Sequence, residues 1–117
     1  MATSTITKVI PSGSTDGKPV KITATATAGT TFHTAHATAL DEITMYLTNT
    51  DSSDRAVTVE FGGATAPDWN VKFIVPAGET ILAIPGIPLT NSTTCKAFAA
   101  AANVVNMLGY INRIVQT

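Results

Sequence analysis

Short runs of alternating apolar and polar residues, separated by clusters of turn-forming residues, recur along this chain about every 10 residues. In residues 42–49, for example, Ile43, Met45 and Leu47 occupy every second position. Successive side chains of a β-strand point to opposite sides, so this spacing gives a strand one apolar and one polar face. A chain made of many such strands folds as an antiparallel β-sandwich or barrel, and we therefore expect an all-β fold.

The alternating runs predict about eight short strands. In the first of them, Thr23, Thr25 and Thr27 share one face, as expected for β-branched residues on the exposed side of a strand. The predicted strands lie at residues 20–27, 31–37, 42–49, 55–61, 71–75 and 79–84, with two more in the last third of the chain.

Two turn regions determine the expected connections between these strands. Residues 50–54 (Thr-Asp-Ser-Ser-Asp) are dense in turn formers and predict a β-hairpin between residues 42–49 and 55–61. Residues 85–88 (Pro-Gly-Ile-Pro) are expected to end the strand at residues 79–84, because proline has no N–H to donate to a neighbouring strand.

Residues 97–108 fit two different structures. The alanine run favours a helix, with Gly109 as its cap. However, Val104 and Val105 are β-branched, and no Asp or Glu occupies the first turn of such a helix. The alternation that begins at Val105 favours two strands joined by a turn near residues 102–103.

Residues 1–19 differ from the rest of the chain. They are polar, with a short extended piece at residues 6–10 and a turn-rich stretch at residues 11–19. We expect an N-terminal arm here, which either frays or lies along the sheet edge of a neighbouring subunit. Residues 20–117 are expected to form the β-domain itself.

The composition excludes several classes of partner. Only 13% of the residues are charged, about half the usual quarter, and threonine takes their place. Such a surface costs little to desolvate, which fits a subunit of an assembly, and the alternative is an ordinary threonine-rich β-domain. The net charge is −1 and no basic run is present, so we expect no nucleic-acid partner. No apolar stretch is long enough to cross a membrane.

Few residues offer chemistry. His33 and His36 lie close in sequence, but residues three apart on a strand face opposite ways, so we expect partly exposed strand histidines. The alternative is a site on the symmetry axis of an oligomer, with one histidine from each subunit. The adjacent carboxylates of Asp41 and Glu42 also point apart, and Cys95 is expected to be a buried apolar residue. We therefore expect neither a catalytic site, nor a metal site within one chain, nor a cofactor.

The aromatic residues offer a different kind of site. Trp69 follows a Gly-Gly loop, and with Tyr46 and Tyr110 it would provide rings on which a sugar or a partner protein stacks. The alternative is that Trp69 closes one end of the sandwich as part of the core.

A set of turns and strand cores is spread over residues 20–115. It comprises Asn49-Thr50-Asp51, Val57 to Gly63, Pro67-Asp68, Ile74 to Gly78, Pro85 to Leu89, Ala101 to Asn106 and Gly109 to Ile114. This pattern resembles small β-sandwich virion proteins of tailed bacteriophages.

The resemblance implies a non-enzymatic structural protein located in the virion. It favours a capsid decoration (cement) protein on the outer surface of a phage head, bound to the major capsid protein or to other virion subunits. It also implies a homo-oligomer, with a trimer favoured, and an arm at residues 1–19 that reaches the capsid or an adjoining subunit. The alternatives are a neck, tail or fibre component, and a carbohydrate-binding module used for attachment.

Overall fold

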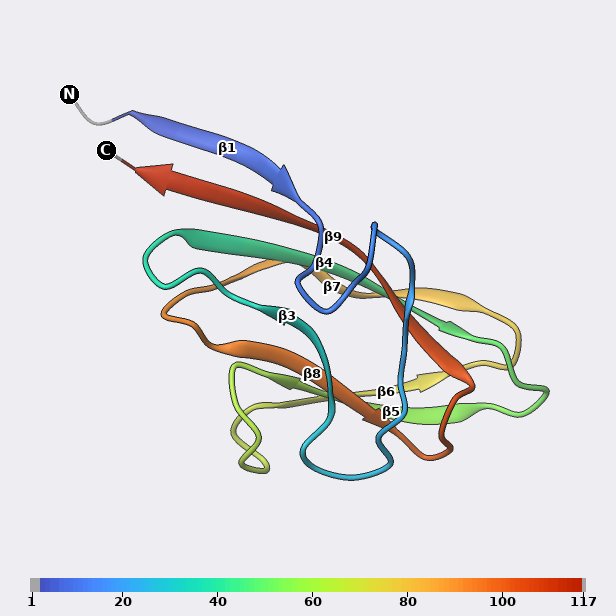
Figure 1. Ribbon diagram of the computed structural model, residues 1–117. Helices are drawn as coiled ribbons and strands as arrows, with labels where there is room; N and C mark the ends of the chain where they lie inside the picture. The colour runs from blue at the N-terminus through green and yellow to red at the C-terminus, as the bar shows by residue number, and fades with distance from the viewer. Residues whose placement is uncertain (1–2, 117) are drawn as a thin grey trace.

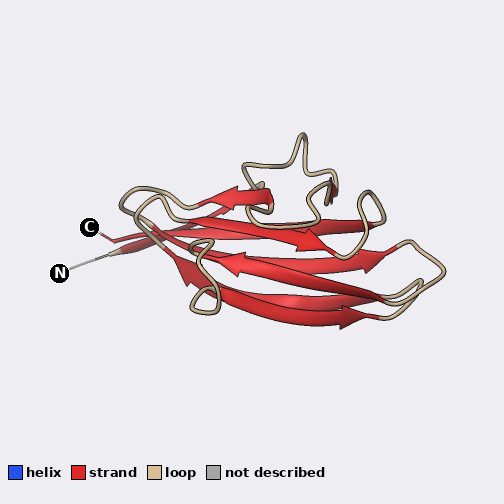
Figure 2. Ribbon diagram, turned by 90° about the horizontal axis from the view of Figure 1, so that it is seen from below, coloured by secondary structure: helices blue, strands red, loops and turns tan. Residues whose placement is uncertain are grey.

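Nine β-strands make up the regular structure of residues 3–116, the part of the chain that the computed structural model describes. They form two antiparallel sheets packed face to face, so the fold is a β-sandwich and not a closed barrel (Figures 1 and 2). Sheet A contains β1 (Ser4–Val9), β9 (Val105–Gln116), β4 (Leu40–Asn49) and β7 (Thr80–Leu89), with β2 (Val20–Lys21) also beside β9. Sheet B contains β3 (Thr30–Thr34), β8 (Thr94–Ala99), β5 (Arg55–Phe61) and β6 (Asn70–Val75).

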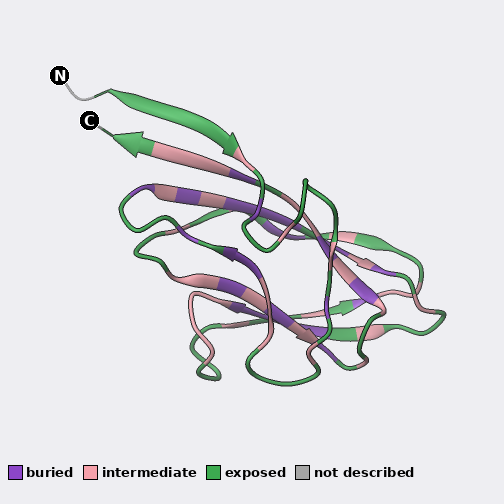
Figure 3. Cartoon of the chain, viewed as in Figure 1, coloured by how far each residue is buried: buried purple, intermediate pink, exposed green. Residues whose placement is uncertain are grey.

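The inner faces of the two sheets form one hydrophobic core (Figure 3). Ile43, Met45 and Leu47 of β4 are completely buried, as their spacing predicts, and they meet Val57 and Val59 of β5 from the other sheet. Within the described residues there is no helix, and so none with the length and apolarity needed to cross a membrane.

The ambiguous last third of the chain is two strands. Cys95, Ala97 and Ala99 of β8 face the core, and the chain turns at Asn103 in the left-handed conformation before it enters β9. The alternative of a helix over residues 97–108 is therefore wrong. Small side chains at every second position of β8 suit a central strand of a thin sandwich, and their burial there outweighs the helical preference of alanine.

The predicted hairpin between residues 42–49 and 55–61 is wrong, because β4 lies in sheet A and β5 in sheet B. The turn between them carries the chain from one sheet to the other. The side-chain amide of Asn49 donates to the carbonyls of Ser53 and Val75, each at 2.9 Å, and Arg55 pairs with Asp51. Alternation of apolar residues looks the same for neighbouring and for facing strands, so the sequence pattern could not distinguish them.

The strand expected at residues 20–27 ends at Lys21. Thr23, Thr25 and Thr27 therefore do not share one face of a strand, because residues 24–29 form a loop against the outer face of sheet B. There Thr27 Oγ1 and the Gly29 N–H, the latter at 2.6 Å, donate to the carboxylate of Glu60. This loop buries Glu60 completely, although its position in β5 faces away from the core.

Two further expectations change at the edges of sheet A. The strand at residues 79–84 does not stop at Pro85 but continues as β7 to Leu89, because β7 is an edge strand and needs no donor on its outer side. The N-terminal arm begins as β1, which pairs with β9 of its own chain from Ser4↔Gln116 to Val9↔Ile111.

Gly109 of β9 is required by a close approach between strands. A Cβ at this position would lie 1.9 Å from the carbonyl oxygen of Thr44 in β4. We expect Gly109→Ala to lower the free energy of unfolding by about 3 kcal/mol, since β4 and β9 would have to separate. Urea denaturation followed by circular dichroism measures this loss.

The control for this substitution is Gly78→Ala. Gly78 has a positive φ of 73°, but a Cβ there meets no atom within 4 Å. The expected cost is that of a left-handed alanine alone, about 1 kcal/mol. Equal losses for the two variants would show that the contact between Gly109 and Thr44 is not tight.

Candidate functional site

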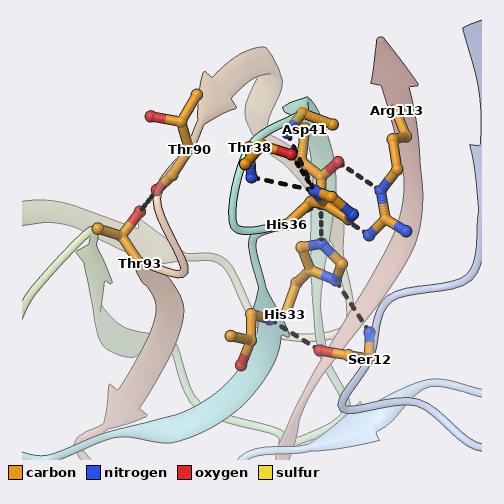
Figure 4. Close-up of polar contacts among 10 residues, drawn as sticks. Ser12, His33, His36, Thr38, Asp41, Thr90, Thr93 and Arg113 are labelled. Atoms are coloured by element: carbon orange, nitrogen blue, oxygen red, sulfur yellow. Dashed lines mark hydrogen bonds and ion pairs between the residues drawn. The ribbon is translucent and has the colours of Figure 1, made fainter. Parts of the chain in front are cut away.

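A cluster of polar side chains is buried between the two sheets, near the end where the termini lie (Figures 1 and 4). Its centre is Asp41 of β4, which is completely buried. Arg113 of β9 donates from Nε to Oδ1 at 2.9 Å and from Nη2 to Oδ2 at 3.0 Å. His33 of β3 lies with Nε2 2.7 Å from Oδ2, and the backbone N–H of His36 donates to the same oxygen at 3.0 Å. The cluster therefore joins sheet A to sheet B.

The protonation of His33 follows from its neighbours. The backbone N–H of Ser12 donates to Nδ1 at 3.0 Å, so Nδ1 carries no proton and Nε2 donates to Asp41 (Figure 4). Ser12, His33 and Asp41 are the residue types of a catalytic triad, but the serine contacts the imidazole through its backbone. The Ser12 hydroxyl instead accepts from the N–H of Thr34 at 2.7 Å. The arrangement is a clamp on residues 12–13 and not a nucleophile beside its base.

The surroundings of Asp41 control its ionisation. Burial by itself raises the pKa of this carboxyl group. The hydrogen bonds from Arg113, His33 and the His36 backbone, together with the charge of Arg113, outweigh burial and lower the pKa from 3.8 to about 2. Asp41 is therefore charged over the whole range in which most proteins are folded.

The structure separates the two histidines that were considered for a symmetry axis. His33 lies inside the sandwich with 1% of its surface exposed, so the expectation of a partly exposed histidine is wrong here and a neighbouring subunit cannot reach it. His36 is exposed in the loop before β4, where its Nδ1 accepts from the backbone N–H groups of Thr38 and Ala39 at 3.1 and 3.0 Å. Its ring holds that loop in shape and leaves only the Nε2 side open to a partner.

Cys95 is buried, as expected from its place in a strand. Desolvation raises the pKa of its thiol to about 12, which leaves it protonated and unreactive. Among residues 3–116, no group of three or more His, Cys, Asp or Glu side chains is arranged to hold a metal ion.

Two tyrosines and two leucines gather on the outer face of sheet A. We call Tyr46, Leu82, Leu108 and Tyr110 the tyrosine face. Tyr46 of β4 lies directly opposite Leu108 of β9 on one side and Leu82 of β7 on the other. Tyr110 is two residues beyond Leu108 in β9 and therefore lies on the same face. Tyr46, Leu82 and Tyr110 are 37%, 49% and 36% exposed.

Two charged groups, one of each sign, border the tyrosine face. The Lys8 ammonium lies over the Tyr110 ring, 4.5 Å from its centroid. Glu42 of β4 lies on the same face, opposite Asn112 and next to the pair formed by Thr44 and Tyr110. Farther along the same face, a hollow of about 380 Å³ is lined by Thr38, Leu40, Thr90, Ile114 and Gln116, none of which is titratable. The hollow therefore offers hydroxyl, amide and apolar groups to a partner.

The structure does not bring Trp69 together with the two tyrosines. Trp69 precedes β6 of sheet B, and its ring stands against the backbone of Gly62 and Gly63. It is 45% exposed, so one part of the ring packs on the loop and the other is open to solvent. Each aromatic site must therefore be considered separately.

The polar cluster is the feature that the sequence did not reveal. Asp41 and Arg113 are 72 positions apart, and Ser12 contributes a backbone N–H that any residue has. The one available signal was a charged residue on the apolar side of a strand: Asp41 stands two places before Ile43 and therefore faces the core.

Asp41→Asn is expected to lower the free energy of unfolding at neutral pH by about 3 kcal/mol, because it leaves the partly buried guanidinium of Arg113 without its opposite charge. Because the folded-state pKa of Asp41 lies below its ordinary value, its contribution is complete above about pH 4 and is lost as the pH falls towards 2. Denaturation with urea at several pH values measures both effects. A difference between wild type and variant that stays constant from pH 7 to pH 2 would contradict this assignment.

Comparison of the chain with protein-family models, with curated proteins and with solved structures gives no match in any of the three. The likeness to phage virion proteins therefore remains a likeness of sequence pattern.

Proposed function

We propose that this chain is a non-enzymatic structural protein of a phage virion, and that it decorates the outer surface of the head by binding the major capsid protein. The observation that carries the proposal is the tyrosine face. A sheet face that exposes two tyrosines and a leucine, with only Lys8 and Glu42 as charged neighbours among the described residues, has the composition of a protein-binding surface.

The chemistry of the remaining surface supports the same role. A decoration protein meets the same wide and shallow surface on many copies of the capsid protein. A surface covered by hydroxyl groups is desolvated at less cost than one covered by charges. Because only 13% of its residues are charged, this chain has few charged side chains to desolvate when it attaches. Tyrosine adds a large contact area and a hydroxyl group that bonds at the rim.

A neck, tail or fibre component would use the same surface, and the particle to which the chain binds distinguishes these roles from decoration. A carbohydrate-binding module is favoured by one separate observation, the half-exposed ring of Trp69 at the end of sheet B. Sugar-binding sites place such a ring beside hydrogen-bonding groups, and Asp68 and Asn70 flank it in sequence.

The proposal is tested by co-sedimentation with phage heads that lack this chain. We expect wild type to bind heads, and Leu82→Glu to bind more than tenfold more weakly, since it places a charge beside Tyr46 at the β7 end of the apolar contact. Ile74→Glu is the matched control, because Ile74 is exposed to 65% but lies on β6 of sheet B. Deletion of residues 1–19 is not a suitable test, because it would remove β1 and the buried Pro11 from the fold.

Equal binding of Leu82→Glu and wild type would overturn the role of the tyrosine face. Binding to tails and not to heads would place the chain elsewhere in the virion. Binding that is lost in Trp69→Ala and inhibited by free glycans would identify the carbohydrate-binding module instead.

A further inference from the structure

The edges of the two sheets are protected to different degrees. An unprotected edge strand offers unpaired N–H and C=O groups to any other strand. The β7 edge contains Pro85 and Pro88. The β3 edge is covered by the N-terminal segment: the Gly13 N–H donates to the Phe32 carbonyl at 2.9 Å, and the Thr34 N–H donates to the Ser12 hydroxyl.

The β1 edge has no such protection. In the described part of the chain β1 pairs with β9 alone. Its sequence, Ser-Thr-Ile-Thr-Lys-Val, contains no proline and a single charge, and it consists mainly of residues that favour strands. The β6 edge is the other open one, but it has Lys72 in its middle and ends before Pro76.

The position of β1 makes its edge accessible. β1 and the end of β9 run past the rest of the sandwich as a two-stranded ribbon, with the two termini side by side (Figure 1). Leu40, the first residue of β4, pairs with Ile114, so the last two residues of β9 lie beyond β4 and pair only with β1. In Figure 3 most of β1 is exposed.

An apolar row on the outer face of sheet A stops abruptly at this edge. Leu40 of β4, Ile114 of β9 and Ile6 of β1 are direct neighbours across three strands. Ile6, at the open end of the row, is 65% exposed. A strand added beside β1 with an apolar residue opposite Ile6 would extend the row and cover this side chain.

We propose that β1 pairs with β1 of a second copy of this chain, antiparallel and around a two-fold axis at Ile6. This register places Ile6 opposite Ile6, Thr5 opposite Thr7 and Ser4 opposite Lys8 of the two copies. All of these pairs are compatible on one sheet, and the two lysines lie far from each other. Sheet A of one copy then joins sheet A of the other into one continuous sheet. The apolar row Leu40, Ile114, Ile6 of the first copy continues into the same row of the second.

Self-complementarity is the reason for choosing a second copy as the partner. Shifting the axis to Thr7 would place Lys8 opposite Ile6, which is a poorer match. An isologous contact of this kind closes at two subunits, whereas the trimer expected from the resemblance needs two different surfaces, such as the β1 and β6 edges. Self-association is a property of the chain alone and does not depend on a role in a virion.

Sedimentation equilibrium of the full chain, without any phage particle, tests the proposal. Wild type is expected at twice the chain mass of 12.1 kDa. Ile6→Lys is expected at the monomer mass, because it places two charges together at the axis. Ile74→Lys is the matched control and should remain a dimer, since Ile74 is as exposed as Ile6 but lies on the β6 edge.

The pairing register is tested by Ile6→Cys. Directly opposite residues have Cβ atoms about 5 Å apart, so copper phenanthroline with dissolved oxygen should link the two copies through a disulfide. Ile74→Cys should stay unlinked, and the buried Cys95 gives no background. A monomeric wild type, a trimer, or a dimer that Ile74→Lys dissociates and Ile6→Lys does not would each overturn the proposal.

Discussion

The buried carboxylate of Asp41 holds together parts of the molecule that are far apart in sequence. It accepts hydrogen bonds from Arg113 of β9, from His33 of β3 and from the backbone before β4. Burying a charge is costly, and the geometry is stable because each oxygen has its own donors. Through His33 the same carboxylate fixes the tautomer that accepts from Ser12, so the N-terminal segment depends on it as well.

The position of β1 follows from this arrangement. Residues 12–13 are fastened to β3 at the edge of sheet B, while Ser4–Val9 pairs with β9 at the edge of sheet A. The N-terminal segment thus closes one open side of the sandwich and at the same time leaves a bare strand edge outside it. The polar cluster that joins the two sheets lies inside, and the outer face of sheet A carries the exposed tyrosines and Leu82. Such a surface is the basis of the proposed attachment to another protein.

The sequence was informative where a local pattern decides the structure. The burial of Ile43, Met45 and Leu47 and the two strands around Asn103 follow from period-two spacing and from β-branched residues. Which strands are neighbours depends on contacts across the core, and so the link after Asn49 could be taken for a hairpin. The row Thr23, Thr25, Thr27 alternates like a strand but has no large apolar partner face. The cluster around Asp41 joins residues from four separate segments, which no spacing rule connects.

Hydroxyl-radical footprinting of the chain, free and bound to phage heads, tests the proposed attachment surface most directly. If the tyrosine face is the surface that binds, oxidation of Tyr46 and Tyr110 falls several-fold in the bound state, while oxidation of Trp69 does not change. Protection of Trp69 with unchanged Tyr46 and Tyr110 would contradict this assignment and would move the binding surface to the end of sheet B.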